Sequence, residues 1–377
     1  MIEAEPNEGS ARSAPHGGAD LGFNLMRNAF AQAKRMHPDL FHDSSYVLAG
    51  QPVRMRIVGR RLAEFMHLPF AHLRAEEPHS MAPRLTIELW DQAETNVSCQ
   101  LGLRRDDLDL HPNLKHSTDG RYASYQLQHS LVSLDRSSDF ICGYASNAEE
   151  LSLYERGRPL HVLLSLWHKS LDMPLVHGGL VSKSGRGVLL AGPGGSGKST
   201  SAITSACAGF DYLSEDLVAL QSSPDGGFVG HSLYSSTFIE PDHLKRFALF
   251  EPYAIEGKYS FEKKLLVLLS QIASLRFARA CRIHAVVLPR VLNLPASRLR
   301  PASKGEALLT LAPSSLLVGE KSHGLQGFNK LAKLVEQVPC YWLELGGALE
   351  EIPAVLEGLL SERRVIELWG CGETSPS

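Results

Sequence analysis

An apolar residue occupies every second position in two segments of the first part of the chain, 53–57 and 85–89. This period of two places the apolar side chains on one face of a β-strand and the polar ones on the other. Other segments have apolar residues at spacings of three and four, which predicts amphipathic helices. The remaining predicted elements of this part are helices at 21–36, 61–68 and 149–170 and strands at 122–134 and 140–144.

Strands and helices alternate in the second part of the chain, which is typical of an α/β domain. The apolar run 188–191 predicts a buried strand, and a glycine-rich segment and a helix at 198–208 follow it. The segment 232–265 has no clear period, so we expect mostly loop and short helix there. Further predicted elements are strands at 212–220, 283–288 and 340–345 and helices at 306–311, 326–337 and 349–360.

The 377 residues leave room for two domains. The pattern predicts an N-terminal, β-rich α+β domain at 21–150 and an α/β nucleotide-binding domain at 151–365. Residues 1–20 are rich in small and acidic residues and are predicted to be a disordered lead-in, and residues 366–377 are predicted to be a tail.

Composition and charge exclude several classes of protein. Hydrophobic residues make up 44% and charged residues 21% of the chain, as in a globular protein with a full core. The net charge of -3 gives no overall attraction to nucleic acid or to an anionic membrane. The six cysteines are scattered, which favours reduced thiols over disulfides or a zinc site. With no signal pattern and no apolar run near the ~20 residues of a membrane span, we expect a cytoplasmic protein, and a homo-oligomer is left open.

The segment Gly192–Ser199 fits the phosphate-binding pattern G-x-x-x-x-G-K-[ST]. Backbone N–H groups of such a loop can wrap a phosphate, Lys198 supplies a positive charge, and the Ser199 hydroxyl can bind Mg²⁺. A strand precedes the loop and a helix follows it, as this chemistry requires. The sequence therefore predicts a site for ATP and Mg²⁺. Its nucleotide-binding residues are predicted to be Gly192, Gly194, Gly195, Ser196, Gly197, Lys198, Ser199 and Thr200.

Motors, transporters and GTPases carry a second strand that ends in a metal-supporting carboxylate. Here the best later strand, 283–288, ends in Pro289-Arg290. The nearest carboxylates belong to Glu215 and Asp216, and the helix and short strand after the loop should return them to its side of the sheet. Arg290 is a candidate clamp for nucleotide or substrate, with a solvated strand-end charge as the alternative. Tyr234, Ser235 and Ser236 are weaker candidates for the lining of an acceptor site.

A histidine is predicted to lie near the loop. Ser184-Gly185 is a good two-residue hairpin turn between 175–182 and 187–191. If the strands pair about this turn, His177 lies opposite Gly192 at the mouth of the loop. A shift of one residue would turn His177 to the other face. A structural histidine at a strand end is the alternative, and the two remain open on the sequence alone.

These segments together resemble the HPr kinase/phosphorylase family. The resemblance rests on His177–Val181, the hairpin, the loop Gly192–Thr200 and the segment Gly209–Val218 with its acidic pair. It is closer to the HPr-kinase-like serine kinases found near peptide-modification genes, including lasso-peptide kinases. It covers 174–220 specifically and weakens towards residue 345.

The resemblance implies a P-loop domain of HPr-kinase type and roles for three residues. Glu215 would be the base for the acceptor hydroxyl, Asp216 would help to hold Mg²⁺, and His177 would be the active-site histidine. The family usually has Asp-Asp, so Glu215 is a departure that lengthens the side chain and puts its reach in doubt. The glycine-rich stretch that follows the pair in the HPr enzyme is not recognisable here, so neither HPr as substrate nor the reverse phosphorylase reaction is expected.

The resemblance thus implies an ATP- and Mg²⁺-dependent kinase that transfers the γ-phosphoryl group to a serine-type hydroxyl of a peptide or protein. Maturation of a peptide natural product is one setting for it. Two alternatives remain: a small-molecule kinase, and a regulatory protein that binds a nucleotide without transferring phosphate. The unusual Glu215 is the feature that favours the last of these.

Overall fold

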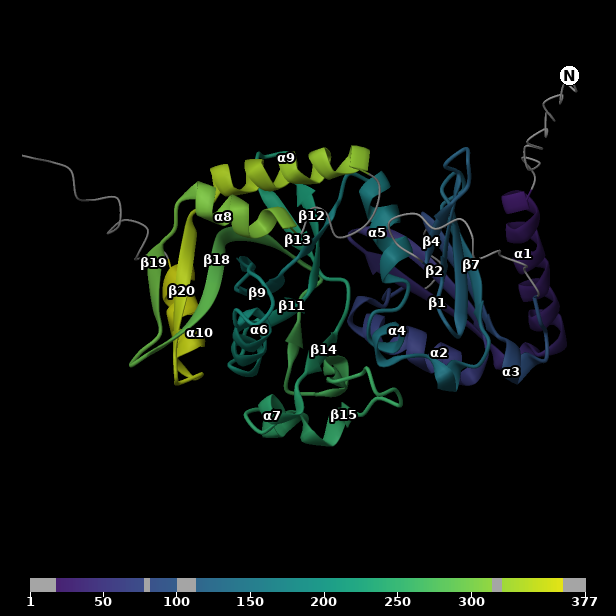
Figure 1. Cartoon of the computed structure of the whole chain (residues 1–377), viewed down its shortest axis with the longest axis horizontal. Coiled ribbons are helices and arrows are strands. Elements are labelled where there is room, and N and C mark those ends of the chain that lie inside the picture. Colours follow the sequence, from purple (N-terminus) through teal and green to yellow (C-terminus); the bar gives the residue numbers. More distant parts are fainter. Residues whose placement is uncertain (1–17, 78–81, 100–112, 314–320, 362–377) are drawn as a thin grey trace, which may run out of the picture.

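The computed structural model describes residues 18–77, 82–99, 113–313 and 321–361. Within these ranges the chain has an α/β fold with two large sheets side by side and a smaller one below them (Figure 1). The predicted tail and residues 1–17 of the predicted lead-in lie outside the described residues. In the described part, no helix has the length and apolar character needed to cross a membrane.

The first sheet has the strand order β1-β2-β3-β7-β6-β5-β4. On β2, Val53, Met55 and Ile57 are buried while the alternate residues are partly exposed, which confirms the predicted period of two. The strands are β1 (Phe41–Leu48), β2 (Gln51–Val58), β3 (Leu85–Asp91), β4 (Leu114–His116), β5 (Tyr122–Gln126), β6 (Ser130–Asp135) and β7 (Phe140–Ala145).

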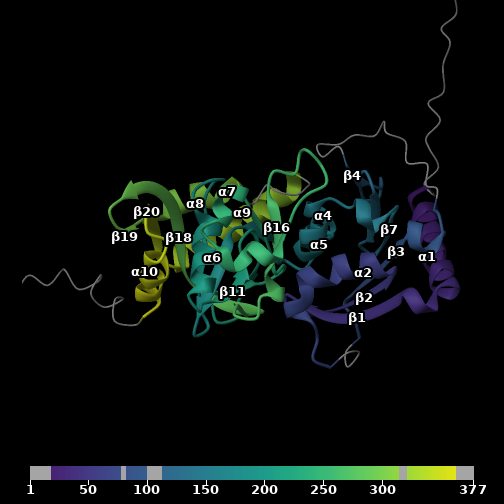
Figure 2. The same ribbon diagram turned by 90° about the horizontal axis from the view of Figure 1, so that it is seen from below.

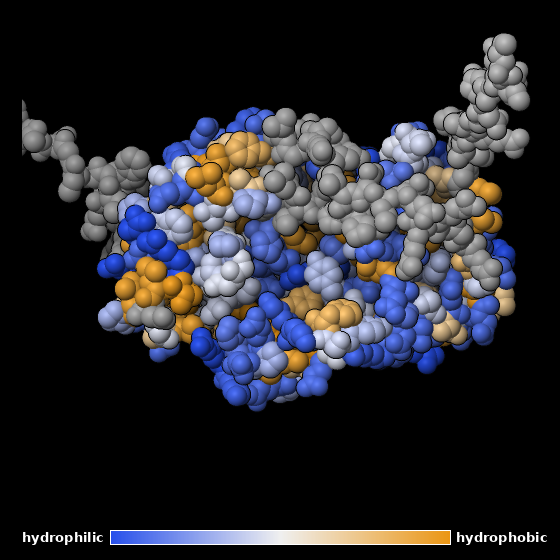
Figure 3. Space-filling model, in the orientation of Figure 1, coloured by the Kyte–Doolittle hydropathy of each residue, from blue (hydrophilic) through white to orange (hydrophobic). Residues whose placement is uncertain are grey.

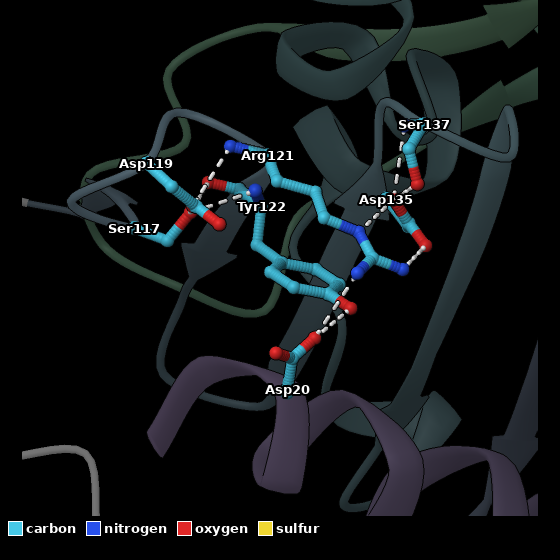
Figure 4. Close-up of polar contacts among 7 residues, drawn as sticks. All are labelled: Asp20, Ser117, Asp119, Arg121, Tyr122, Asp135 and Ser137. Carbon is cyan, nitrogen blue, oxygen red and sulfur yellow. Dashed lines mark hydrogen bonds and ion pairs between the residues drawn. The ribbon is translucent and has the colours of Figure 1, made fainter. Parts of the chain in front are cut away.

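Helices cover both faces of this sheet. Helix α1 (Gly18–Met36) packs Phe23, Met26 and Phe30 on one face. Its first turn is fixed by Asp20, whose carboxylate accepts hydrogen bonds from Tyr122 and Arg121 (Figure 4). The helices on the opposite face and at the sheet edge are α2 (Arg60–His67), α3 (Gln92–Thr95), α4 (Leu153–Gly157) and α5 (His161–Ser170).

The second sheet has the order β17-β11-β9-β10-β18-β13-β12-β8, with β20 beside β18 and β19 beside β20. Strand β10 runs parallel to β18, and β18 runs parallel to β20. The strands are β8 (Leu175–His177), β9 (Gly179–Lys183), β10 (Arg186–Leu190), β11 (Asp211–Ser214), β12 (Leu217–Ser222), β13 (Phe228–His231), β17 (Arg276–Phe277), β18 (Ala280–Leu294), β19 (Arg298–Pro301) and β20 (Cys340–Gly346).

Helices again lie on both faces of the sheet, because its central strands are apolar on both sides. Leu189 of β10 packs in a core with helices α8 (Lys304–Leu311) and α9 (Lys321–Gln337). Its neighbours Val188 and Leu190 pack in the core of the opposite face, with helices α6 (Lys198–Cys207) and α10 (Glu351–Leu360). Figure 1 shows these two helical layers above and below the sheet.

A small sheet of β14 (Ser236–Ile239), β16 (Leu265–Leu268) and β15 (Ala254–Ile255) forms a lobe with helix α7 (Pro241–Leu244). The prediction of mostly loop and short helix for 232–265 agrees with α7 and the loops around it, but it missed the short strands. Each of them has two to four residues. A run this short does not establish a period, so the sequence pattern could not reveal it.

The predicted strand 122–134 is divided into the hairpin of β5 and β6. Two further predicted elements are interrupted. The predicted helix 149–170 is broken between α4 and α5, where Pro159 lacks an N–H donor and Leu160 has a left-handed φ of 59°. The predicted strand 212–220 is divided into β11 and β12, with Glu215 and Asp216 in the break. Both interruptions bring polar side chains to the same place, described below.

The two large sheets share a hydrophobic core. Helix α5 contacts β5 of the first sheet and β8 of the second. Its buried residues Leu163 and Trp167 belong to a cluster that includes Ile57 from the first sheet and Ala219 from the second. Figure 2, seen from below, also places α4 and α5 between the two sheets. The division near residue 150 remains a prediction.

Candidate functional site

The glycine-rich loop connects β10 to α6, with the helix beginning at Lys198. Gly195 and Gly197 have φ angles of 77° and 102°, which favour glycine. A Cβ atom at Gly197 would also collide with Cδ1 of Leu345. The loop can therefore take this path because these positions lack side chains.

Lys198 is buried under the loop and points back into it. Its Nζ donates hydrogen bonds to the carbonyl oxygens of Gly192, at 2.7 Å, and Pro193, at 3.0 Å. Burial lowers the pKa of Lys198, and the negative charges of Asp216 and Glu215 oppose this shift. The carboxylates are thus near enough to the lysine to act on its charge.

A cavity of about 940 Å³ opens over the loop and extends to the lobe that contains α7. Most of the predicted site residues meet in its wall: His177, Gly194, Gly195, Gly197, Lys198, Ser199, Thr200, Glu215 and Asp216. Gly192 and Ser196 lie in the loop but do not line the cavity. The Ser196 hydroxyl is buried and has no hydrogen-bond partner among the described residues.

The predicted return of the acidic pair to the loop is seen in this cavity, but the predicted position of His177 is wrong. Strands β9 and β10 pair in the predicted register, from Lys183 with Arg186 to Gly179 with Leu190. The chain then leaves the hairpin at Gly178, whose N–H donates to the carbonyl oxygen of Asp216 at 2.8 Å.

The residues before Gly178 form a separate strand, β8, which pairs with β12. His177 therefore lies opposite Leu217 and not opposite Gly192. Its Nδ1 is 2.9 Å from Oδ1 of Asp216. His177 therefore lies in the predicted site because of its contact with Asp216, and not because it pairs with Gly192.

Arg158 lies between the two carboxylates. One guanidinium nitrogen is 3.2 Å from Oε1 of Glu215, and another is 3.0 Å from Oδ2 of Asp216. Its side chain is 12% exposed and packs on the rings of Phe238, at 4.7 Å, and Tyr154, at 5.4 Å. Burial opposes the charge of Arg158, but Asp216 and Glu215 raise its pKa above the usual value.

Sequence reasoning missed Arg158 because it lies inside the segment predicted as one helix. Pro159 immediately follows it. A proline at that point disfavours helical geometry at the residue before it, and so it could have marked Arg158 as a loop residue. Nothing local, however, indicates which carboxylates the guanidinium would reach.

The two acids differ in their surroundings. Burial alone would raise the pKa of Asp216, but the charge of Arg158 and the hydrogen bond to His177 lower it to about 2. Asp216 is therefore ionised at neutral pH. Glu215 is buried, with Oε1 directed to Arg158 and, at 3.4 Å, to the N–H of Phe238. Its Oε2 is buried without a hydrogen-bond partner among the described residues.

The donors present fit a magnesium ion that is shared with a nucleotide. Ser199 and the ionised Asp216 both line the cavity. Mg²⁺ is commonly bound by one or two protein oxygens, with substrate phosphates and water completing six ligands. No group of three or more His, Cys, Asp or Glu side chains suited to a metal occurs among the described residues. A metal held by the protein alone is therefore not supported.

The weaker candidates do not line the cavity. Arg290 pairs with Glu344 and packs over the ring of Trp342 at 4.6 Å. The side chains of Tyr234, Ser235 and Ser236 are buried, and their hydroxyls donate to backbone carbonyl oxygens. These contacts give all four residues structural roles, and Tyr234 and Ser236 bind the carbonyl oxygens of Pro159 and Gly157 on either side of Arg158.

Comparison with known proteins gives a distant structural similarity. No protein-family model matches the chain, and no curated protein sequence matches it. Among solved structures, the Hpr(Ser) kinase/phosphatase from Coxiella burnetii matches 52% of this chain and 98% of its own, at 10% identity and a TM-score of 0.26. A similarity this weak carries no conclusion about function, so the family resemblance seen in the sequence remains a prediction.

Proposed function

We propose that this protein is an ATP- and Mg²⁺-dependent kinase that transfers the γ-phosphoryl group to a hydroxyl, in particular a serine of a peptide or protein in the cytoplasm. The observation that carries the proposal is the meeting of two groups in one cavity. Lys198 lies at the start of α6, and Glu215 lies in the same wall with one buried carboxylate oxygen that has no hydrogen-bond partner among the described residues.

The loop supplies the features needed to bind phosphate. Its glycines allow the backbone to come close to the ligand, and the N-terminus of α6 favours negative charge at the same point. In the proposed complex, Lys198 would exchange its hydrogen bonds to loop carbonyl oxygens for bonds to phosphate oxygens. Ser199 and Asp216 would hold Mg²⁺, which would supply positive charge to neutralise part of the phosphate charge.

Glu215 is suited to act as general base. The acceptor hydroxyl would donate a hydrogen bond to Oε2 of Glu215 and lose its proton to it as the hydroxyl oxygen bonds to the γ-phosphorus. The bond between that phosphorus and the β–γ bridging oxygen breaks, and ADP leaves. Arg158 holds the other oxygen of Glu215, at 3.2 Å, and so orients the carboxylate.

The shape of the cavity favours an acceptor larger than a metabolite. Beyond the acidic pair, its wall continues along Leu153 and Tyr154 of α4 and Phe238 of β14. A peptide segment carrying a serine would have apolar surface to contact there. Maturation of a peptide natural product rests on the sequence resemblance alone.

Transfer of label from γ-labelled ATP in the presence of Mg²⁺ tests the proposal. We expect label on serine-containing peptides and its loss in Lys198→Ala, with mass spectrometry locating the phosphate. Label on a metabolite pool and not on peptides would indicate a small-molecule kinase. Tight ATP binding with no transfer to either class of acceptor would favour a regulatory protein.

A further inference from the structure

One wall of the cavity carries several basic side chains. The wall belongs to the lobe built from α7, β14, β15 and β16, whose visible surface is mostly hydrophilic in Figure 3. His243 and Arg246 come from α7 and the turn after it, and Lys263 comes from the segment before β16. All three residues are exposed and line the cavity.

His243 and the two cations Arg246 and Lys263 have no ion pair or side-chain hydrogen bond among the described residues. The acidic residues in the same cavity are engaged elsewhere. Glu262 accepts hydrogen bonds from the N–H groups of Leu153 and Tyr259, and Glu215 and Asp216 bind Arg158. Lys264 is 3.9 Å from Glu240. The part of the wall that belongs to this lobe carries Arg246, Lys263 and Lys264 against Glu240 and Glu262, which leaves a small excess of positive charge.

The segment 258–264 is held in place by the N-terminal part of the chain. The Tyr259 hydroxyl donates to the carbonyl oxygen of Glu150 at 2.7 Å, and the Lys258 ammonium reaches the carbonyl oxygen of Glu149. Phe261, 67% exposed, stacks on Tyr259 with their ring centroids 5.2 Å apart. The anchors fix Lys263 at the cavity rim, next to an exposed aromatic ring.

We propose that His243, Arg246 and Lys263 form a subsite for an acidic acceptor, a peptide with carboxylates close to its reactive hydroxyl. The inference rests on the proposed kinase function. Carboxylates flanking the hydroxyl would bind these cations, while apolar parts of the peptide would contact Phe261 and Phe247 of the same wall.

The nucleotide does not require His243, Arg246 or Lys263. Its phosphates have the loop N–H groups, Lys198 and Mg²⁺ as partners within the proposed site. Lys264 is a different case, because its ammonium lies 3.9 Å from Oε1 of Glu240. We therefore leave Lys264 out of the acceptor subsite.

Peptide binding tests the subsite without requiring catalysis. Two labelled peptides, Asp-Glu-Ser-Asp-Glu and its amide counterpart Asn-Gln-Ser-Asn-Gln, would be titrated by fluorescence anisotropy with Mg²⁺ and a non-hydrolysable ATP analogue present. We expect the acidic peptide to bind at least tenfold more tightly, with a preference that weakens as salt is added. The double variant Arg246→Ala/Lys263→Ala should abolish the preference. Lys245→Ala, an exposed cation beside Arg246 that does not line the cavity, should leave it unchanged.

Equal affinity for the two peptides would overturn the inference. It would also be overturned if Lys245→Ala lost the preference for the acidic peptide to the same extent as the double variant. A double variant that binds the ATP analogue more weakly but keeps the peptide preference would show that the cations serve the nucleotide, which also overturns it. Failure of the kinase proposal gives a different result. In that case the wild-type protein would transfer no label from γ-labelled ATP to any hydroxyl, whether or not it binds the ATP analogue and whatever its preference between the peptides.

Discussion

Glu215 and Asp216 are neighbours in the chain, but their oxygens are used differently. Asp216 is bound by Arg158 and His177, whereas Oε2 of Glu215 has no partner among the described residues. We expect Glu215→Gln to lower the rate of phosphate transfer by about 10²- to 10⁴-fold, because the amide cannot accept a proton. ATP affinity should change less than about threefold, since the amide keeps the shape of the side chain. Single-turnover kinetics and direct nucleotide binding measure the two quantities.

Glu215→Asp serves as the control for reach. It keeps the base and has the residue that the resembled family uses at this position, but it shortens the side chain. We expect partial activity, between that of Glu215→Gln and the wild-type protein. A fully active Glu215→Gln protein would refute the assignment of Glu215 as base.

The charge of Arg158 lowers the pKa of Asp216, and its removal should therefore change the pH dependence. The pKa of Asp216 is about 2, below its usual value, so ionised Asp216 stabilises the fold above pH ~4 and this contribution is lost as pH falls towards 2. Without Arg158, burial raises the pKa of Asp216. We expect Arg158→Met to move the acid limb of the activity profile to higher pH and to lower the free energy of unfolding at neutral pH by about 3–5 kcal/mol.

A control variant shows whether the effect is specific to the buried ion pairs of Arg158 or follows from the removal of an ion pair anywhere. Arg276 pairs with Asp211 at 2.8 Å, but its side chain is 66% exposed. Arg276→Met should cost less than about 1 kcal/mol because solvent screens the pair, and it should leave the pH profile unchanged. Denaturant titrations and rate measurements over the same pH series compare the variants. An unshifted acid limb in Arg158→Met would show that Arg158 has no such effect on Asp216.

Gly197 is constrained both by its backbone conformation and by the side chain of Leu345. Gly197 precedes α6 with a φ of 102°, and a Cβ there would collide with Leu345 of β20. Gly209, just after the same helix, has a φ of 86°, but a Cβ there would meet no other atom within 4 Å. Gly197→Ala should therefore reduce the free energy of unfolding by about 1–3 kcal/mol more than Gly209→Ala, because overpacking adds to backbone strain. Thermal and chemical unfolding provide the comparison, and equal losses would contradict it.

Local patterns predicted those elements whose own residues determine them. The register of β9 and β10 follows from the turn Ser184-Gly185 and was predicted correctly. The path of the chain before this hairpin was not predicted correctly. At Gly178 it depends on a hydrogen bond to Asp216, which is distant in sequence. The same limit applies to the site. The loop has a sequence motif, whereas Arg158 reaches the acidic pair only through the packing of the chain.

At the scale of the whole molecule, helix α5 makes the two large sheets depend on one core. Leu163 of α5 is fully buried in the cluster that contains residues from both sheets. Leu163→Ala should therefore lower the free energy of unfolding by about 2–5 kcal/mol. We expect hydrogen exchange to accelerate by the same factor in β3 of the first sheet and β10 of the second, since a shared core opens cooperatively. Leu309→Ala, at a leucine that is 78% exposed on α8, should change neither rate appreciably. Faster exchange in β3 alone would mean that the first sheet unfolds independently of the second. The position of Arg158, between α4 and α5, would then not depend on the first sheet.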